Sequence, residues 1–178
     1  MIDNPNTGVF LCQCGSNIEP LIDLNTLKQD MERQTNVGHC EIMPYSCLKP
    51  GIEKITRIVA KKKLNRVIIA GCEGRLMLKK MENDLRLLDL HRGQIDMVNL
   101  RGHIAAVSDR SPVENAVKAK KLLIASVAEL SVLKPSQHRL ARIDGPVMIV
   151  GGGAASFSAA RELSRNKIEY FLSPLLCE

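Results

Sequence analysis

Four cysteines stand where their thiols could do chemistry together: Cys12, Cys14, Cys47 and Cys72. The chain has six cysteines in all, and its first residues show no secretory signal, so a reducing, cytoplasmic environment is expected. Disulfides seldom persist there, and thiolates more often bind metal or take part in redox chemistry. Cys177 is set aside because it lies in a terminal tail.

The number of these thiols fits two kinds of metal site. Four thiolates satisfy a 4Fe-4S or 2Fe-2S cluster, and they equally satisfy a tetrahedral structural zinc. Zinc sites usually show paired Cys-x-x-Cys knuckles, whereas one close pair and two isolated cysteines favour a bulkier cluster. Gly15, Gly71 and Gly74 allow the loop backbone to approach closely. Buried thiols, or a dicysteine redox centre at Cys12 and Cys14, remain alternatives.

The segments that carry these cysteines alternate between short runs rich in Val and Ile and longer stretches of helical period. This alternation is typical of βαβ units, so we expect an α/β fold with an open, mainly parallel sheet and helices on both faces. The expected strands are 8–12, 40–45, 66–70 and 95–100, and the expected helices are 23–34, 52–63, 76–88 and 111–133.

The expected strands bring the cysteines to one edge of this sheet. Loops at the carboxyl ends of parallel strands converge on a crevice where ligands bind. Cys12 and Cys14 leave the first strand, Cys47 follows the second, and Cys72 follows the third. These four residues are therefore the predicted metal ligands. Cys40 is expected at the amino end of its strand, on the opposite edge, and is excluded.

A second, smaller unit is predicted near the end of the sequence. Pro135 stops the last long helix, and a polar linker is expected before a partial Rossmann-like βαβ unit. So small a fragment exposes apolar surface and a strand edge, which predicts self-association or a partner subunit. The predicted divisions are 1–134 for the cysteine-rich domain, 135–146 for the linker and 147–178 for the βαβ unit.

A glycine-rich turn connects the first strand and the helix of this βαβ unit. Gly151-x-Gly153 in that place is the start of a dinucleotide-binding fingerprint, with Gly151, Gly153 and Ala154 as candidate cofactor contacts. The third glycine position is Ser156, and no acidic residue ends the next strand. The pattern favours a tight strand-to-helix turn slightly over independent flavin or nicotinamide binding.

Composition argues against two classes of partner. The net charge is +6, but the Lys and Arg residues are spread along helical segments and only 3% of residues are aromatic. Stacking platforms for nucleic acid are therefore nearly absent, and no nucleic-acid binding is expected. No apolar run approaches the roughly 20 residues of a membrane-spanning helix, so no membrane insertion is expected.

Several segments of the chain resemble the amino-terminal region of the heterodisulfide reductase A subunit family, which contains flavin and iron-sulfur proteins of redox complexes. The matching segments are GVFLCQCGSNI (8–18), YSC (45–47), LNRVIIAGC (64–72), NLR (99–101) and VGGGAA (150–155). The resemblance implies a cluster-binding region that includes Cys12, Cys14, Cys47 and Cys72. It also implies a non-catalytic electron-transfer part of an oxidoreductase complex, holding a 4Fe-4S cluster, with other redox subunits as partners.

The sequence departs from the family pattern at two places. Ile104 stands where related sequences tend to carry a cysteine after the Asn-x-Arg segment, and Glu73-Gly74 replaces the usual Ser-Pro. Most of the family's flavin domain is missing from these 178 residues, so FAD binding is not expected of this chain alone. The competing hypothesis is a nucleotide-binding or flavin-binding fragment, or a zinc-stabilised scaffold subunit, without redox activity.

Overall fold

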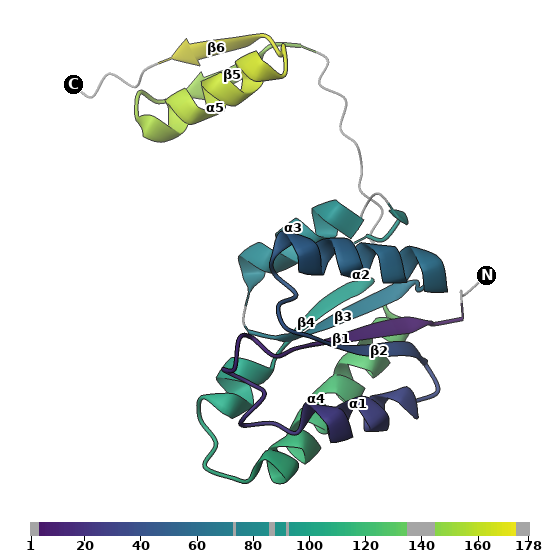
Figure 1. Cartoon of the computed structure of the whole chain (residues 1–178). Coiled ribbons are helices and arrows are strands. Elements are labelled where there is room, and N and C mark those ends of the chain that lie inside the picture. The colour runs from purple at the N-terminus through teal and green to yellow at the C-terminus, as the bar shows by residue number, and fades with distance from the viewer. Residues whose placement is uncertain (1–3, 73, 86–87, 92, 135–144, 174–178) are drawn as a thin grey trace. The chain divides into compact units, whose positions relative to one another are not determined.

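The computed structural model describes residues 4–72, 74–85, 88–91, 93–134 and 145–173. The chain divides into two compact units, Met1–Gln137 and His138–Glu178 (Figure 1). Most of the predicted linker 135–146 lies outside the described residues, so the predicted domain limits stay a prediction. No helix in the described ranges is long and apolar enough to cross a membrane.

The larger unit is built on a parallel sheet of four strands in the order β2-β1-β3-β4. All residues of the two central strands are buried, as expected for Val-rich and Ile-rich strands covered on both faces. In chain order the strands are β1 (Thr7–Cys12), β2 (Val37–Met43), β3 (Arg66–Gly71) and β4 (Ile95–Asn99).

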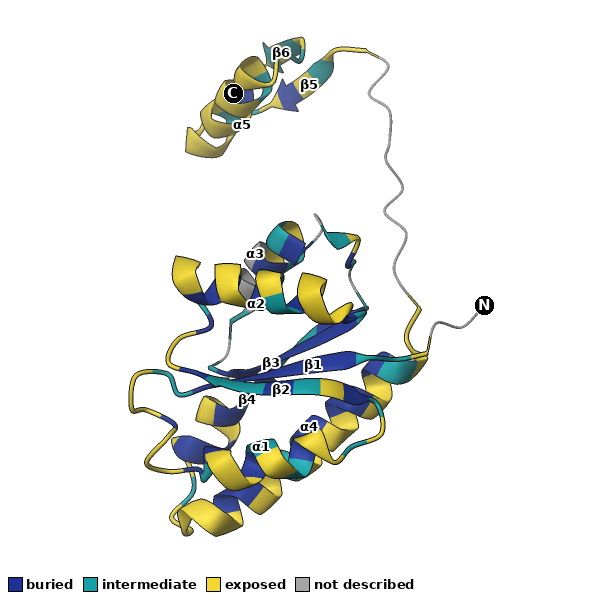
Figure 2. Cartoon of the chain, turned by 45° about the vertical axis from the view of Figure 1, so that its right-hand side comes forward, coloured by how far each residue is buried: buried dark blue, intermediate teal, exposed yellow. Residues whose placement is uncertain are grey.

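Helices cover both faces of this sheet, α1 and α4 on one face and α2 and α3 on the other (Figures 1 and 2). Alternate residues of a strand point to opposite faces. Val9 and Leu11 therefore pack with α1 and α4, whereas Phe10 packs with α2 and α3. The helices are α1 (Leu24–Glu32), α2 (Lys49–Lys62), α3 (Arg75–Leu85) and α4 (Pro112–Val132), and a π-helix, Arg101–Ala105, follows β4.

Local sequence signals fix where two of these helices begin. The side chain of Asp23 accepts hydrogen bonds from the backbone N–H groups of Asn25 and Thr26 and so caps α1. Ser111 and Glu114 form a reciprocal capping box at the start of α4, with Pro112 in its first turn.

The smaller unit is a single βαβ motif with β5 (Val147–Val150), α5 (Ala154–Arg165) and β6 (Tyr170–Ser173). Its two strands are parallel and pair Met148 with Phe171. Both of these side chains are more than half exposed, so one face of the two-stranded sheet is uncovered in this unit. The unit is an incomplete Rossmann-like motif, as predicted.

The predicted fold class is confirmed: an open parallel sheet with helices on both faces, followed by an incomplete Rossmann-like unit. One strand position was wrong. β2 begins at Val37, three residues before the predicted start, so Cys40 lies in the middle of β2 rather than at its amino end. Cys40 is fully buried and packs on the α1 and α4 side of the sheet. Strand ends are hard to predict because Gly38 and His39 carry little β signal.

Candidate metal centre

The carboxyl ends of β1 and β3 flank the point where the strand order reverses. The chain runs from β1 outward to β2 and then crosses back to β3 on the other side of β1. Open α/β sheets bind ligands at such a switch point. Cys12 is the last residue of β1, and Cys72 directly follows β3. The topology thus brings two of the predicted ligands to the place where this fold binds ligands.

The two strands approach closely at this point. A Cβ atom added to Gly71 would lie 2.9 Å from the Cβ of Cys12, closer than real Cβ contacts allow. The glycine at the end of β3 therefore leaves room for the Cys12 side chain on β1. The predicted approach of backbone to a cluster at Gly71 stays a prediction.

Cys12 is 2% exposed and has polar backbone partners on the loop after β2. The backbone N–H of Ser46 donates a hydrogen bond to Sγ of Cys12 at 3.4 Å, and Sγ lies 3.9 Å from the carbonyl oxygen of Pro44. A backbone N–H directed at sulfur stabilises negative charge on that sulfur, and such contacts tune metal-bound thiolates.

The loop after β1 places Cys14 in an unusual backbone conformation. Cys14, Gly15 and Ser16 have φ values of 54°, 57° and 67°, a run of three residues in the left-handed region. Left-handed backbone costs a non-glycine residue roughly 1–2 kcal/mol, so the surrounding contacts must hold it. The side-chain amide of Asn17 donates to the Cys14 carbonyl oxygen at 2.7 Å, and the Tyr45 ring lies against Gly15.

The thiols of Cys12, Cys14 and Cys72 are close enough to act on one another. Burial raises the pKa of the Cys14 thiol, and the charges of Cys72 and Cys12 raise that pKa further, whereas the guanidinium of Arg101 lowers it. A hydrogen-bonding contribution from Cys72 raises the pKa of Cys14 slightly further. Metal ligands must be deprotonated, so metal binding here would release the proton that the raised pKa keeps on the Cys14 thiol.

Cys47 reaches the same edge of the sheet from the loop after β2. It is half-buried, and it lines a small cavity together with Ser46 and Cys72. The apolar wall of this cavity includes Ile69 and Met97. The loops thus carry all four predicted ligands to one edge. Among the side chains that the structure describes, however, no group of three or more His, Cys, Asp or Glu is placed to hold a metal ion.

Ile104 occupies the position where the family pattern favours a cysteine. It lies in the π-helix, is fully buried, and belongs to the apolar core formed with α1 and α4. Cys14 packs against this same core. The isoleucine is therefore accommodated as a core residue beside the cysteine loop, where it supplies no ligand.

Sequence reasoning missed two contributors to this edge, Arg101 and the backbone amide of Ser46. Arg101 stands two residues after the end of β4, so the rule that gathered the cysteines at strand exits also applies to it. The Ser46 amide had no sequence signal, because any residue except proline supplies a backbone N–H.

The glycine turn of the smaller unit is a tight connection between β5 and α5. Gly151 has a φ of +132°, and an added Cβ would lie 2.7 Å from Oγ of Ser156. Gly153 is the extended residue before α5, and Ala154 is the first residue of that helix. The predicted cofactor contacts at Gly151, Gly153 and Ala154 therefore sit at a helix amino end, and nucleotide binding there stays a prediction.

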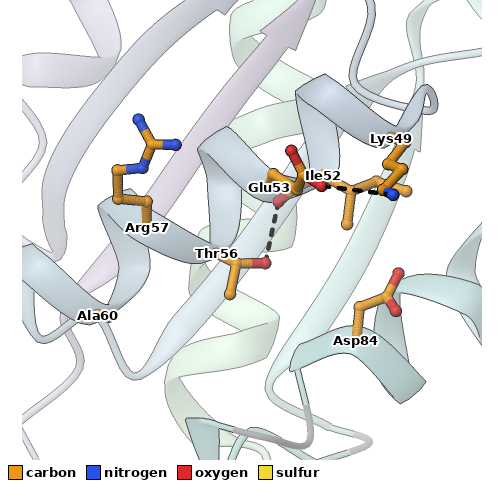
Figure 3. A pocket seen from close by; sticks show the side chains of 7 residues that line it. All are labelled: Lys49, Ile52, Glu53, Thr56, Arg57, Ala60 and Asp84. Carbon is orange, nitrogen blue, oxygen red and sulfur yellow. Dashed lines mark hydrogen bonds and ion pairs between the residues drawn. The ribbon is translucent and has the colours of Figure 1, made fainter.

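A larger surface pocket of about 580 Å³ is lined by residues of α2 and by Asp84 of α3, and none of the four predicted ligands lines it (Figure 3). Lys49, Glu53 and Arg57 follow one another along α2, and Asp84 stands across from them on α3. Lys49 and Glu53 form an ion pair at 4.0 Å. Exposed side chains of opposite charge at i and i+4 are typical of a solvated helix face.

The fold and the cysteine edge define a doubly wound α/β protein with thiols at the switch point of its sheet. No protein-family model matches the chain. Curated relatives do match it, and they confirm the resemblance to the heterodisulfide reductase A subunit family.

Three relatives illustrate this similarity. An iron-sulfur A subunit of CoB–CoM heterodisulfide reductase from Methanopyrus kandleri is 28% identical over 96% of this chain and 25% of its own length. A protein of Archaeoglobus profundus, named as similar to the heterodisulfide reductase A subunit, is 26% identical over 96% of this chain and 24% of its own. The A subunit of the ferredoxin:CoB–CoM heterodisulfide reductase from Methanosarcina mazei is 30% identical over 88% of this chain and 20% of its own length. The chain thus spans about a quarter of the length of the relatives it matches.

Proposed function

We propose that this chain is an iron-sulfur electron-transfer module of a heterodisulfide-reductase-like redox complex. Cys12, Cys14, Cys47 and Cys72 would hold a 4Fe-4S cluster, and the chain would pass single electrons to and from other redox subunits. The observation that carries the proposal is that Cys12 ends β1 and Cys72 directly follows β3, at the switch point of the sheet, with Cys14 two residues beyond Cys12.

Two features of the edge favour a cluster with four thiolate ligands. Its ligands would come from three separate loops, and the Ser46 amide already donates to the Cys12 sulfur at 3.4 Å. A cluster would supply one-electron chemistry, while the protein would bury the sulfurs and direct hydrogen bonds at them. The names of the relatives, one of which includes the word iron-sulfur and another the word ferredoxin, support the same class of role.

The test is the content of iron, acid-labile sulfide and zinc in protein purified without oxygen. About four iron and four sulfide per chain, the stoichiometry of a cubane cluster, is the expected result. Zinc in place of iron would favour the scaffold hypothesis, and protein without either metal would remove the redox role. A bound flavin, visible as a yellow colour that remains after iron is chelated, would favour the nucleotide-binding alternative.

A further inference from the structure

Arg101 stands beside the cysteine edge because of the register between β3 and β4. Asn99, the last residue of β4, pairs with Gly71, the last residue of β3. Cys72 follows Gly71 by one residue, and Arg101 follows Asn99 by two. Cys72 and Arg101 therefore follow the ends of two neighbouring parallel strands and lie at the same edge of the sheet.

The backbone around Arg101 is fixed by an uncommon helix. Its π-helix spans Arg101–Ala105, and such segments often occur at functional sites. The side-chain oxygen of Asn99 accepts a hydrogen bond from the Gly102 backbone N–H at 2.6 Å, and the Lys118 ammonium donates to the His103 carbonyl oxygen at 3.0 Å. The π-helix is thus tied to β4 through Asn99 and to α4 through Lys118.

Arg101 is exposed, although buried residues precede and follow it in the same segment. Leu100 and Ile104, on either side of it in sequence, are both fully buried, whereas Arg101 is exposed. Its guanidinium still acts electrostatically on Cys14, in the direction that favours the thiolate. The buried residues Leu100 and Ile104 thus hold the backbone of Arg101, an exposed cation, at the same edge of the sheet as Cys72.

We propose that Arg101 raises the reduction potential of the cluster held at Cys12, Cys14, Cys47 and Cys72, an inference that rests on the proposed function. Four thiolates give such a cluster a net negative charge, and each one-electron reduction adds one more negative charge. A neighbouring cation stabilises the reduced state more than the oxidised state. Arg101 would therefore set the potential by charge, without being a ligand.

The experiment compares the midpoint potentials of the wild-type chain, Arg101→Lys, Arg101→Gln and Arg101→Glu, each reconstituted without oxygen and titrated with dithionite. The matched control is Arg110→Gln, because Arg110 is also exposed but acts on Glu114 at the start of α4. The expected order of potentials is wild type and Arg101→Lys highest, Arg101→Gln lower and Arg101→Glu lowest, with Arg110→Gln unchanged. The spread should shrink in about 1 M salt, where the Debye length falls to about 3 Å.

Each other outcome decides the question as well. Unchanged potentials in Arg101→Gln and Arg101→Glu, with full iron content, would overturn the role of Arg101 and leave the proposed function intact. If Arg101→Gln lost its iron, retention of iron and potential in Arg101→Lys would support the charge-based role, and loss in both would overturn it. A wild-type chain without iron would overturn the proposed function, and this inference with it.

Discussion

The backbone N–H of Ser46 and the sulfur of Cys12 are joined by a 3.4 Å hydrogen bond that links the loop after β2 to the end of β1. The two residues are 34 positions apart in the sequence. The contact shows that the cysteine edge is a three-dimensional arrangement in which the end of one strand supplies a thiol and a loop supplies its hydrogen-bond donor.

Replacement of Cys72 by serine should abolish iron binding, because a serine hydroxyl is a poor ligand for a cluster that prefers soft thiolates. The measurement is iron and acid-labile sulfide per chain after anaerobic reconstitution. Cys177→Ser is the control and should retain full iron content, since Cys177 is not a predicted ligand. Equal loss from both variants would contradict the ligand assignment.

Replacement of Gly71 by alanine should destabilise the larger unit, because the new Cβ would lie 2.9 Å from the Cβ of Cys12. Gly71 ends β3 and Cys12 ends β1, the two central strands. Relief of the contact therefore requires a shift of the strand backbone, at a cost of about 1–3 kcal/mol. The free energy of unfolding in urea measures this cost. Gly145→Ala is the matched control, since nothing lies within 4 Å of a Cβ at that position, and a similar loss in both variants would argue against the contact.

Replacement of Gly15 by alanine combines two costs that a double-mutant cycle can separate. The left-handed backbone, with a φ of +57°, costs alanine about 1–2 kcal/mol, and the new Cβ would also meet the Tyr45 side chain. In a Tyr45→Ala background the second cost should vanish and the first should remain. The free energies of unfolding of the wild type, the two single variants and the double variant check this. If Gly15→Ala costs as much stability in the Tyr45→Ala background as in the wild type, the ring does not confine Gly15.

The stability of the chain should depend on the ionisation of Glu41. Burial raises the pKa of the Glu41 carboxyl, but hydrogen bonds from Lys54 and His39 outweigh burial and leave that pKa below its usual value. A carboxyl with a lowered folded-state pKa adds stability above its unfolded pKa of about 4.3, and the stability is lost as the pH falls through the folded-state pKa.

The variant Glu41→Gln should therefore be less stable than the wild type at pH 7. The difference should be about 1 kcal/mol or less, because the ion pair of Glu41 and Lys54 is partly exposed, and it should shrink below about pH 4. Urea unfolding at a series of pH values measures this. The exposed Glu53, whose oxygen is 4.0 Å from Lys49, provides the control Glu53→Gln with a smaller effect. A difference that stays constant from pH 7 to pH 3 would contradict the role of the carboxylate.

Much of the fold was determined by the sequence itself. The runs Gly8–Cys12 and Arg66–Ala70 carry enough β-branched and apolar residues to be buried strands, and both became central strands of the sheet. The Ser111, Pro112 and Glu114 pattern fixed the start of α4 because the capping box is a local interaction. The carboxyl-edge location of Cys12 and Cys72 followed from strand direction, which the alternation of strands and helices already implied.

The tertiary structure alone decided which groups surround those cysteines. The strand order put β1 beside β3, so that Cys14 meets Cys72, and the register of β4 brought Arg101 to the same edge. The left-handed run from Cys14 to Ser16 and the Ser46 hydrogen bond depend on contacts between distant loops. Local propensity and hydrophobic period describe one segment at a time, and neither contains the pairing of strands that sets these distances.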